Sequence, residues 1–231
     1  MEQSIPADVK RQLRQEAGFG CCRCGHPFLQ YHHIIPLAVE RHNRPQDMMA
    51  VCGNCHHLFT VGAEPEVDQR KYKTTPRNVR EGMSRGRLYT TSTELKVRVG
   101  GGMAVNTPNL LTTWNDRHIV SARLSDDGRV LLSALIQDID GQLVAVLRDN
   151  EWSALPGRVW DFECSPMKAT VRSAPGRLAF EADCRGEVVE VKGEWFVAGQ
   201  RVTFTPSGFT VGTNSGSIGE ARNCESFIFV G

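Results

Sequence analysis

The chain has 231 residues, of which 40% are hydrophobic, and a formal net charge of +1. This length allows one large domain or two small ones, and the composition is typical of a folded globular protein. No apolar run approaches the roughly 18 to 20 residues that a transmembrane helix needs, so the sequence predicts no membrane span. The polar start of the chain lacks the apolar centre of a signal peptide, and we expect a cytoplasmic protein.

The small net charge hides a difference along the chain. Residues 1–100 carry 15 Lys and Arg against 10 Asp and Glu, whereas residues 101–231 carry 12 against 16. The most basic stretch runs from Arg70 to Arg98, with nine basic residues against two acidic ones. Such a stretch is either a solvated linker or a surface that contacts phosphates, and we favour phosphate contact.

The first predicted element is a helix over residues 5–17. Pro6 suits the first turn of a helix. Val9 and Leu13 lie four residues apart and therefore share one face. Gly18 is a residue at which helices commonly end.

Residues 21–25 predict a tight knuckle between two cysteines, with Gly25 at the turn. Residues 29–35 have the composition of a strand. A short helix is expected to begin near Cys55. Together these segments predict two strands and a helix around a metal.

Most of the cysteines and histidines lie between residues 21 and 57, namely five of eight cysteines and six of seven histidines. Four of these cysteines form two Cys-x-x-Cys pairs. Cysteines paired in this way beside histidines indicate metal ligands rather than disulfides, although four reduced core cysteines are the alternative. Four thiolates suit one tetrahedral structural zinc. The expected ligands are Cys21, Cys24, Cys52 and Cys55, with Cys22 as a spare thiol.

The histidines need a separate explanation. The pair His32-His33 precedes Ile-Ile-Pro, and His56 directly follows the second Cys pair. Taken together, these motifs resemble the HNH endonucleases, which have a ββα-metal fold supported by a four-Cys zinc. The resemblance covers residues 5–60. It implies a metal-dependent DNA endonuclease in which His33 is the general base, while His32 and His56 hold a divalent metal.

The chemistry of these side chains agrees with such roles. Neighbouring residues of a strand point to opposite faces, so His32 can hold a metal while His33 approaches a phosphate. Neutral imidazole accepts a proton near neutral pH. We expect Mg²⁺, Mn²⁺, Ni²⁺ or Zn²⁺ at this site, with a preference for a transition metal because imidazole ligands favour one. His57 is the alternative to His56, since neighbours on a helix face different directions.

One position departs from the pattern that the resemblance implies. Asp47 stands where the family usually has Asn, five residues before the third cysteine. The Asn usually holds the loop that bears the base, whereas an ionised Asp accepts hydrogen bonds but cannot donate them. Asp47 is therefore a further candidate catalytic residue that could instead orient the ring of His33. Asn43 is a less well placed substitute, and His42 is expected at the surface.

We expect three parts in the chain. Residues 1–62 form the HNH zinc module, and residues 63–102 form a basic segment that links the domains and contacts DNA. A run of three glycines ends this segment. Residues 103–231 form the second domain. The candidate DNA-contacting residues are Arg70, Lys71, Lys73, Arg77 and Arg80.

From residue 103 onward, short apolar alternations are separated by turn signals such as Asp127-Gly128 and Asp140-Gly141. Short strands at roughly ten-residue spacing predict an all-β domain, as a sandwich, a roll or a short solenoid. The fold class expected for the whole chain is therefore α+β. The clearest strand-like segments are residues 130–137, 143–148, 168–173, 177–182, 187–192, 201–206 and 226–231.

Three functions are consistent with this sequence. The first is a metal-dependent DNA endonuclease whose β domain targets or regulates it, or forms a homodimer. By analogy of architecture, such an enzyme suits bacterial restriction or anti-phage defence. The second is a zinc-supported nucleic-acid-binding module without catalysis. The third places recognition of a ligand or protein partner in the β domain, with the nuclease as its effector.

Overall fold

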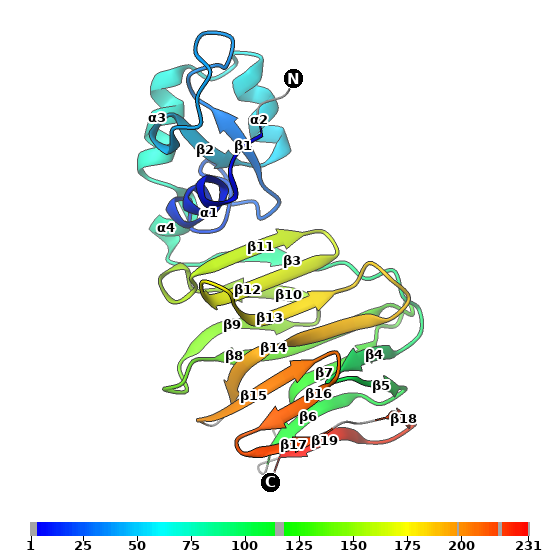
Figure 1. Ribbon diagram of the computed structural model, residues 1–231. Coiled ribbons are helices and arrows are strands. Elements are labelled where there is room, and N and C mark those ends of the chain that lie inside the picture. Colours follow the sequence, from blue (N-terminus) through cyan, green and yellow to red (C-terminus); the bar gives the residue numbers. More distant parts are fainter. Residues whose placement is uncertain (1–3, 114–117, 198, 217–218, 231) are drawn as a thin grey trace. The chain divides into compact units, whose positions relative to one another are not determined.

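The computed structural model describes residues 4–113, 118–197, 199–216 and 219–230. It contains two compact units (Figure 1). Unit 1 is discontinuous and consists of residues 1–86 and 154–164, and unit 2 consists of residues 87–153 and 165–231. The α-helices of the described residues all lie in unit 1, and none of them is long and apolar enough to cross a membrane.

The elements of unit 1 come from both of its segments, and β3 and β11 each end one residue beyond their segment. They are α1 (Ala7–Glu16), β1 (Gln30–His33), η1 (Pro45–Asp47), β2 (Met48–Val51), α2 (Gly53–Thr60), α3 (Glu66–Thr74), α4 (Arg77–Glu81), β3 (Ser84–Arg87), η2 (Pro156–Arg158) and β11 (Asp161–Ser165).

The first helix agrees with its sequence pattern. α1 begins directly after Pro6 and buries Leu13, with Val9 packed against the same core. Gly18 adopts a φ of 63°, in the left-handed region where glycine is favoured, and the chain turns there.

The next three elements position the cysteines and histidines. β1 and β2 pair antiparallel, with His32 opposite Met49. β2 is apolar and buried along its whole length. α2 begins immediately after Cys52, so that its first turn brings Cys55 back towards the knuckle. The core between these elements consists of Leu13, Ala17, Cys21, Cys22, Ile34, Met48, Met49, Ala50, Val51, Cys52, Cys55 and Phe59.

In place of an extended linker, residues 66–81 form two helices of unit 1. α3 carries acidic residues in its first turn and lysines in its last turn, which complements the helix dipole. Gln69 is the one residue of this helix that is buried. α4 follows Pro76 and ends at Gly82, which has a φ of 67°.

Unit 2 consists of strands. They are β4 (Lys96–Val99), β5 (Gly102–Val105), β6 (Asn109–Thr113), β7 (His118–Leu124), β8 (Val130–Gln137), β9 (Leu143–Arg148), β10 (Glu151–Ala154), β12 (Lys168–Ala174), β13 (Arg177–Asp183), β14 (Val189–Val197), β15 (Gln200–Thr205), β16 (Gly208–Val211), β17 (Asn214–Gly216), β18 (Glu220–Arg222) and β19 (Ser226–Val230).

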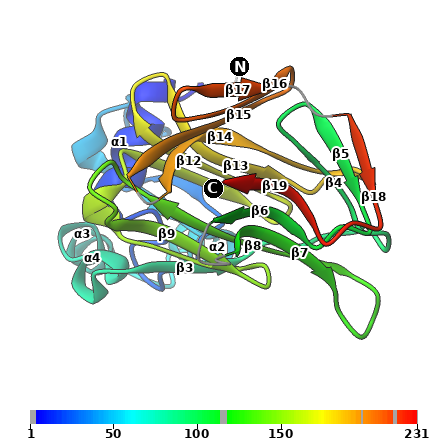
Figure 2. The same ribbon diagram turned by 90° about the horizontal axis from the view of Figure 1, so that it is seen from below.

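These strands confirm the expectation of an all-β region and form one large sheet. Antiparallel pairings follow the chain from β6 to β9 and from β12 to β17. Parallel pairings of β4 with β14, β5 with β18 and β6 with β19 join distant parts of the sequence and close the sheet. Figure 2 shows β4, β5 and β18 side by side. Each of the seven strand-like segments of the sequence overlaps one of these strands. Glu187, Val188 and Pro206 lie outside the strands, and Gly231 is outside the described residues.

Two glycine positions explain local features of this sheet. The glycine run expected in a linker is instead a hairpin turn, because Val99 pairs with Gly102 across Gly100 and Gly101. Both turn residues have positive φ, as a two-residue hairpin loop of type I′ requires. Within β14, a Cβ on Gly193 would lie 2.4 Å from the carbonyl oxygen of Ala179, so the neighbouring strand leaves no room for a side chain there.

Candidate metal centre and active site

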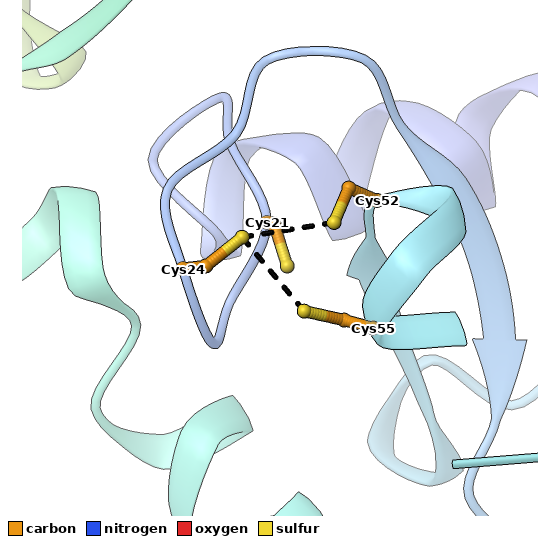
Figure 3. Close-up of side chains that lie close together, drawn as sticks. All are labelled: Cys21, Cys24, Cys52 and Cys55. Atoms are coloured by element: carbon orange, nitrogen blue, oxygen red, sulfur yellow. Dashed lines mark hydrogen bonds between the residues drawn. The ribbon is translucent and has the colours of Figure 1, made fainter. Parts of the chain in front are cut away.

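Four cysteine sulfurs converge in unit 1 (Figure 3). The Sγ atoms of Cys21, Cys24, Cys52 and Cys55 all lie within 4.8 Å of one another. Cys24 Sγ is 3.6 Å from the sulfur of Cys52 and 3.8 Å from that of Cys55. A tetrahedral zinc with Zn–S bonds of about 2.3 Å separates its sulfurs by about 3.8 Å. The cluster therefore has the dimensions of a four-thiolate zinc site, which supports a structural zinc.

The protonation of the thiols is uneven. A hydrogen bond from Cys24 lowers the pKa of Cys21 to about 5, whereas burial raises the pKa of Cys55 to about 12. Zinc binds thiolates, so loading this site releases protons from thiols such as Cys55. Cys22 lies outside the cluster, in the core, where burial raises its pKa to about 12.

Asn78 of α4 holds the knuckle in place. Its Nδ2 donates to the carbonyl oxygen of Gly25 in the knuckle at 3.4 Å, to that of Gly18 at 3.2 Å and to Ser84 Oγ at 3.1 Å. A Cβ on Gly20 would lie 2.1 Å from the same nitrogen, so this close approach requires glycine. Gly25 makes the turn between the two knuckle cysteines and the next strand with a φ of 79°. The knuckle thus depends on α4, a helix that lies outside the cysteine motif.

Arg23 lies beside the four-Cys cluster. Its Nη1 is 3.8 Å from Cys55 Sγ, and its Nη2 pairs with Glu64 at 2.5 Å. Its guanidinium also lies 5.9 Å from the ring centre of Tyr72 on α3. A cation beside thiolates offsets part of their negative charge, so Arg23 suits a cluster of four cysteines around one divalent ion.

His32 and His56 lie next to each other. Their ring centres are 5.2 Å apart, with the rings nearly perpendicular. Two imidazoles that bind one metal through bonds of about 2.1 Å at a tetrahedral angle have ring centres about 5 Å apart. His32 is 8% exposed and burial lowers its pKa to about 4, while burial also lowers the pKa of His56. Both rings are therefore neutral at neutral pH, which is the form that binds metal. His57, the alternative ligand, is exposed on α2.

His33 has different partners. Its Nε2 lies 3.1 Å from the carbonyl oxygen of His42, and the two rings are 5.1 Å apart. Because a carbonyl oxygen only accepts, Nε2 carries the proton and Nδ1 keeps its lone pair. Burial lowers the pKa of His33, and the side chain of Asn43 and the carbonyl of His42 partly oppose that shift. His42 itself is buried rather than at the surface, and its Nε2 lies 3.0 Å from the carbonyl oxygen of Ile35.

Asp47 contacts arginines. Its carboxylate accepts hydrogen bonds from Arg44 at 2.9 Å and from Arg70 at 3.3 Å, and these bonds lower its pKa. Its carbonyl oxygen accepts from the backbone nitrogen of Ile34, just after β1. Asp47 thus ties together the loop between β1 and β2, while the ring of His33 is oriented by His42.

The comparison with known proteins agrees with this geometry. Residues 21–59 match the family model of the HNH endonucleases. This HNH segment contains all four clustered cysteines, the histidine pair and His56. No curated protein and no solved structure matches the chain. The match indicates a nuclease or nucleic-acid-binding function for the HNH segment and leaves the rest of the chain unassigned.

The five candidate DNA-contacting residues fall into two groups. Lys71 and Arg80 are exposed and form no ion pair with any residue that the structure describes. The other three are engaged within unit 1, and Lys73 is the least accessible of them, with 17% of its side chain exposed. The pairs, at 2.7 to 3.3 Å, are Arg70–Glu66, Arg70–Asp47, Lys73–Glu16 and Arg77–Glu81.

Sequence reasoning missed a buried ion pair that completes unit 1. Arg14 of α1 donates to both carboxylate oxygens of Asp161, at 2.9 and 2.6 Å. Its third nitrogen donates to the hydroxyl of Tyr31 on β1 at 2.7 Å. The two charged side chains are 9% and 4% exposed. The partners are 147 residues apart, so no local pattern in the sequence connects them.

Proposed function

We propose that the protein is a divalent-metal-dependent endonuclease that hydrolyses phosphodiester bonds of DNA. The observation that carries this proposal is the pair of neutral imidazoles, His32 and His56, held at metal-sharing distance beside the four-Cys cluster. Their placement on β1 and α2, with β2 between them in the chain, supports a ββα-metal arrangement. The match of the HNH segment to a nuclease family supports the same reaction.

In this proposal each histidine has one role. His32 and His56 hold the divalent metal, which when bound stabilises negative charge on the phosphate and the leaving oxygen. His33 acts as the general base, and its Nδ1 takes a proton from the water that attacks phosphorus. The hydrogen bond from its Nε2 to the carbonyl of His42 supports this role, because it orients the ring and places the lone pair on Nδ1. Imidazole ligands favour Mn²⁺, Ni²⁺ or Zn²⁺ over Mg²⁺.

Asp47 supports the base indirectly. Its bonds to Arg44 and Arg70 support a role in holding the loop between β1 and β2. The same position favours a second candidate function, a zinc-supported nucleic-acid-binding module without catalysis. An ionised Asp engaged by two arginines cannot donate the hydrogen bonds of the Asn that the family usually has there.

We assign DNA contact to the exposed basic side chains of α3 and α4 and assign targeting, sensing or oligomerisation to the β-rich part of the chain. A homodimer would place two active sites on the two strands of a duplex. These assignments are independent of the catalytic roles, because they concern where and when DNA is cut.

The test is cleavage of supercoiled plasmid by the full-length, zinc-loaded protein in Mg²⁺, Mn²⁺ or Ni²⁺. We expect the wild type to convert the plasmid with Mn²⁺ or Ni²⁺ and His33→Ala to lose at least about 100-fold in rate, as for removal of a general base. His57→Ala is the matched control, because His57 is an exposed histidine on α2 outside the proposed site. Normal zinc content with no cleavage in any metal, but retained DNA binding, would favour the second candidate function.

A further inference from the structure

Gln69 is buried in a helix whose other residues face solvent in whole or in part. It is 6% exposed, in the middle of α3, and lies outside the HNH segment. Both ends of its amide are engaged. Nε2 donates to the carbonyl oxygen of Glu64 at 3.1 Å, and Oε1 lies 2.9 Å from Nε2 of His32.

These two contacts determine which nitrogen of His32 carries the proton. A carbonyl oxygen only accepts hydrogen bonds, so the atom of Gln69 that faces Glu64 must be the amide nitrogen. The amide oxygen is therefore the atom that faces the ring. An amide oxygen also only accepts, and Nε2 of His32 must therefore donate. In the neutral ring this leaves Nδ1 as the nitrogen with a lone pair, and a metal binds the nitrogen that has one.

We propose that Gln69 is a positioning residue that holds His32 as the Nε2–H tautomer and so presents Nδ1 to the divalent metal. This inference rests on the proposed function, since it assumes a metal at His32 and His56. Hydrogen bonds to the remote nitrogen of a metal-binding histidine orient the ring and raise its affinity for metal. Here the partner comes from a helix that the cysteine and histidine motifs do not include.

The first test needs no catalytic metal. In the zinc-loaded, full-length protein, ¹⁵N NMR of the imidazole nitrogens should give His32 the shifts of an Nε2–H tautomer. Gln69→Met preserves size but removes the acceptor, and it should shift His32 towards a mixture of tautomers. An unchanged tautomer in Gln69→Met would overturn the proposal.

The second test measures Mn²⁺ affinity from the electron paramagnetic resonance of free Mn²⁺, because Mn²⁺ binds thiolates poorly and leaves the zinc in place. We expect Gln69→Met to weaken binding by about 10- to 100-fold. Gln69→Glu keeps an acceptor for His32 and should stay within about threefold of the wild type. Val67→Ala, at a 72% exposed position on the same helix, is the matched control and should bind as the wild type does.

The outcomes separate this inference from the proposed function. If His32→Ala binds Mn²⁺ as well as the wild type, the metal site itself is wrong. If His32→Ala loses binding but Gln69→Met retains it, only the role of Gln69 is wrong. Tighter binding by Gln69→Met would also overturn this role, because Gln69 would then compete with the metal for Nε2. Should Gln69→Met fail to keep its zinc, Gln69→Ala serves in both tests.

Discussion

Neighbouring cysteines in the knuckle have opposite environments. Cys21 and Cys24 direct their sulfurs into the four-Cys cluster, whereas Cys22 packs in the core of unit 1. The Cys-x-x-Cys spacing lets both ends of a tight turn face one ion, while Cys22, the first of the two residues between them, packs in the core. The same residue type therefore belongs to a candidate zinc site and serves as a small apolar side chain within one turn of chain.

This contrast makes a paired prediction. Cys52→Ser should lose bound zinc and much of the soluble protein, because a structural zinc contributes directly to the folding free energy of a small core. Cys22→Ala should keep about one zinc per chain and lose roughly 1 kcal/mol of stability, since it removes only a buried sulfur. Metal analysis of the purified proteins and thermal unfolding measure both effects. A Cys52→Ser protein that remains soluble with its zinc would contradict the four-Cys site.

At the scale of elements, α3 and α4 combine structural and exposed basic residues. Gln69 and Asn78 reach inward to His32 and to the knuckle, while Lys71 and Arg80 face solvent. Charge alone does not separate these roles, since Lys73 belongs to the same basic stretch yet pairs with Glu16 of α1. Exposure and ion pairing in the folded chain separate them.

We therefore expect different effects from two kinds of lysine and arginine variant. Lys71→Ala combined with Arg80→Ala should weaken DNA binding and reduce its salt dependence by about one to two released counterions, with little change in stability. Lys73→Ala should have a smaller effect on the salt dependence, because this side chain is already neutralised by Glu16. Fluorescence anisotropy of a labelled duplex across a salt series measures both. Equal salt slopes for the wild type and the double variant would remove Lys71 and Arg80 from the DNA-contacting surface.

At the scale of the whole molecule, unit 1 is assembled from two segments that are far apart in the sequence. Residues 154–164 supply Asp161 for Arg14, and Phe162 packs edge-on against Phe19 with ring centres 6.4 Å apart. A chain that ends near residue 100 would leave Arg14 buried without its carboxylate. Such a fragment is not expected to be a stable metal-binding module, because an unpaired buried charge is strongly destabilising.

The full-length chain allows a direct test of this dependence. Asp161→Ala should lower the free energy of unfolding by about 3 to 5 kcal/mol, as for breaking a buried ion pair. Arg14→Met combined with Asp161→Ala should recover part of that loss, because neither charge is then left buried alone. Glu163→Ala is the matched control, since this carboxylate is half exposed and 3.5 Å from the same arginine. Urea unfolding followed by tryptophan fluorescence measures the differences, and a double variant as unstable as Asp161→Ala would contradict the pairing.

The sequence by itself determined the features that depend on spacing along the chain. Two Cys-x-x-Cys pairs are local motifs, and they meet because the antiparallel pair β1 and β2 lies between them and returns the chain to the knuckle. The strands of the β-rich region were also predictable, since alternating apolar residues and Asp-Gly turns act over a few residues.

The tertiary structure decided what depends on long-range contact. Residues 66–81 form helices rather than a linker, and the buried side chains of these helices, Gln69 and Asn78, contact the HNH segment. His42 is buried and its ring packs against His33. Arg14 meets Asp161 although 147 residues separate the two in the sequence. These contacts have no periodicity in the sequence, since each depends on one side chain meeting a distant partner, and only the folded chain brings the two together.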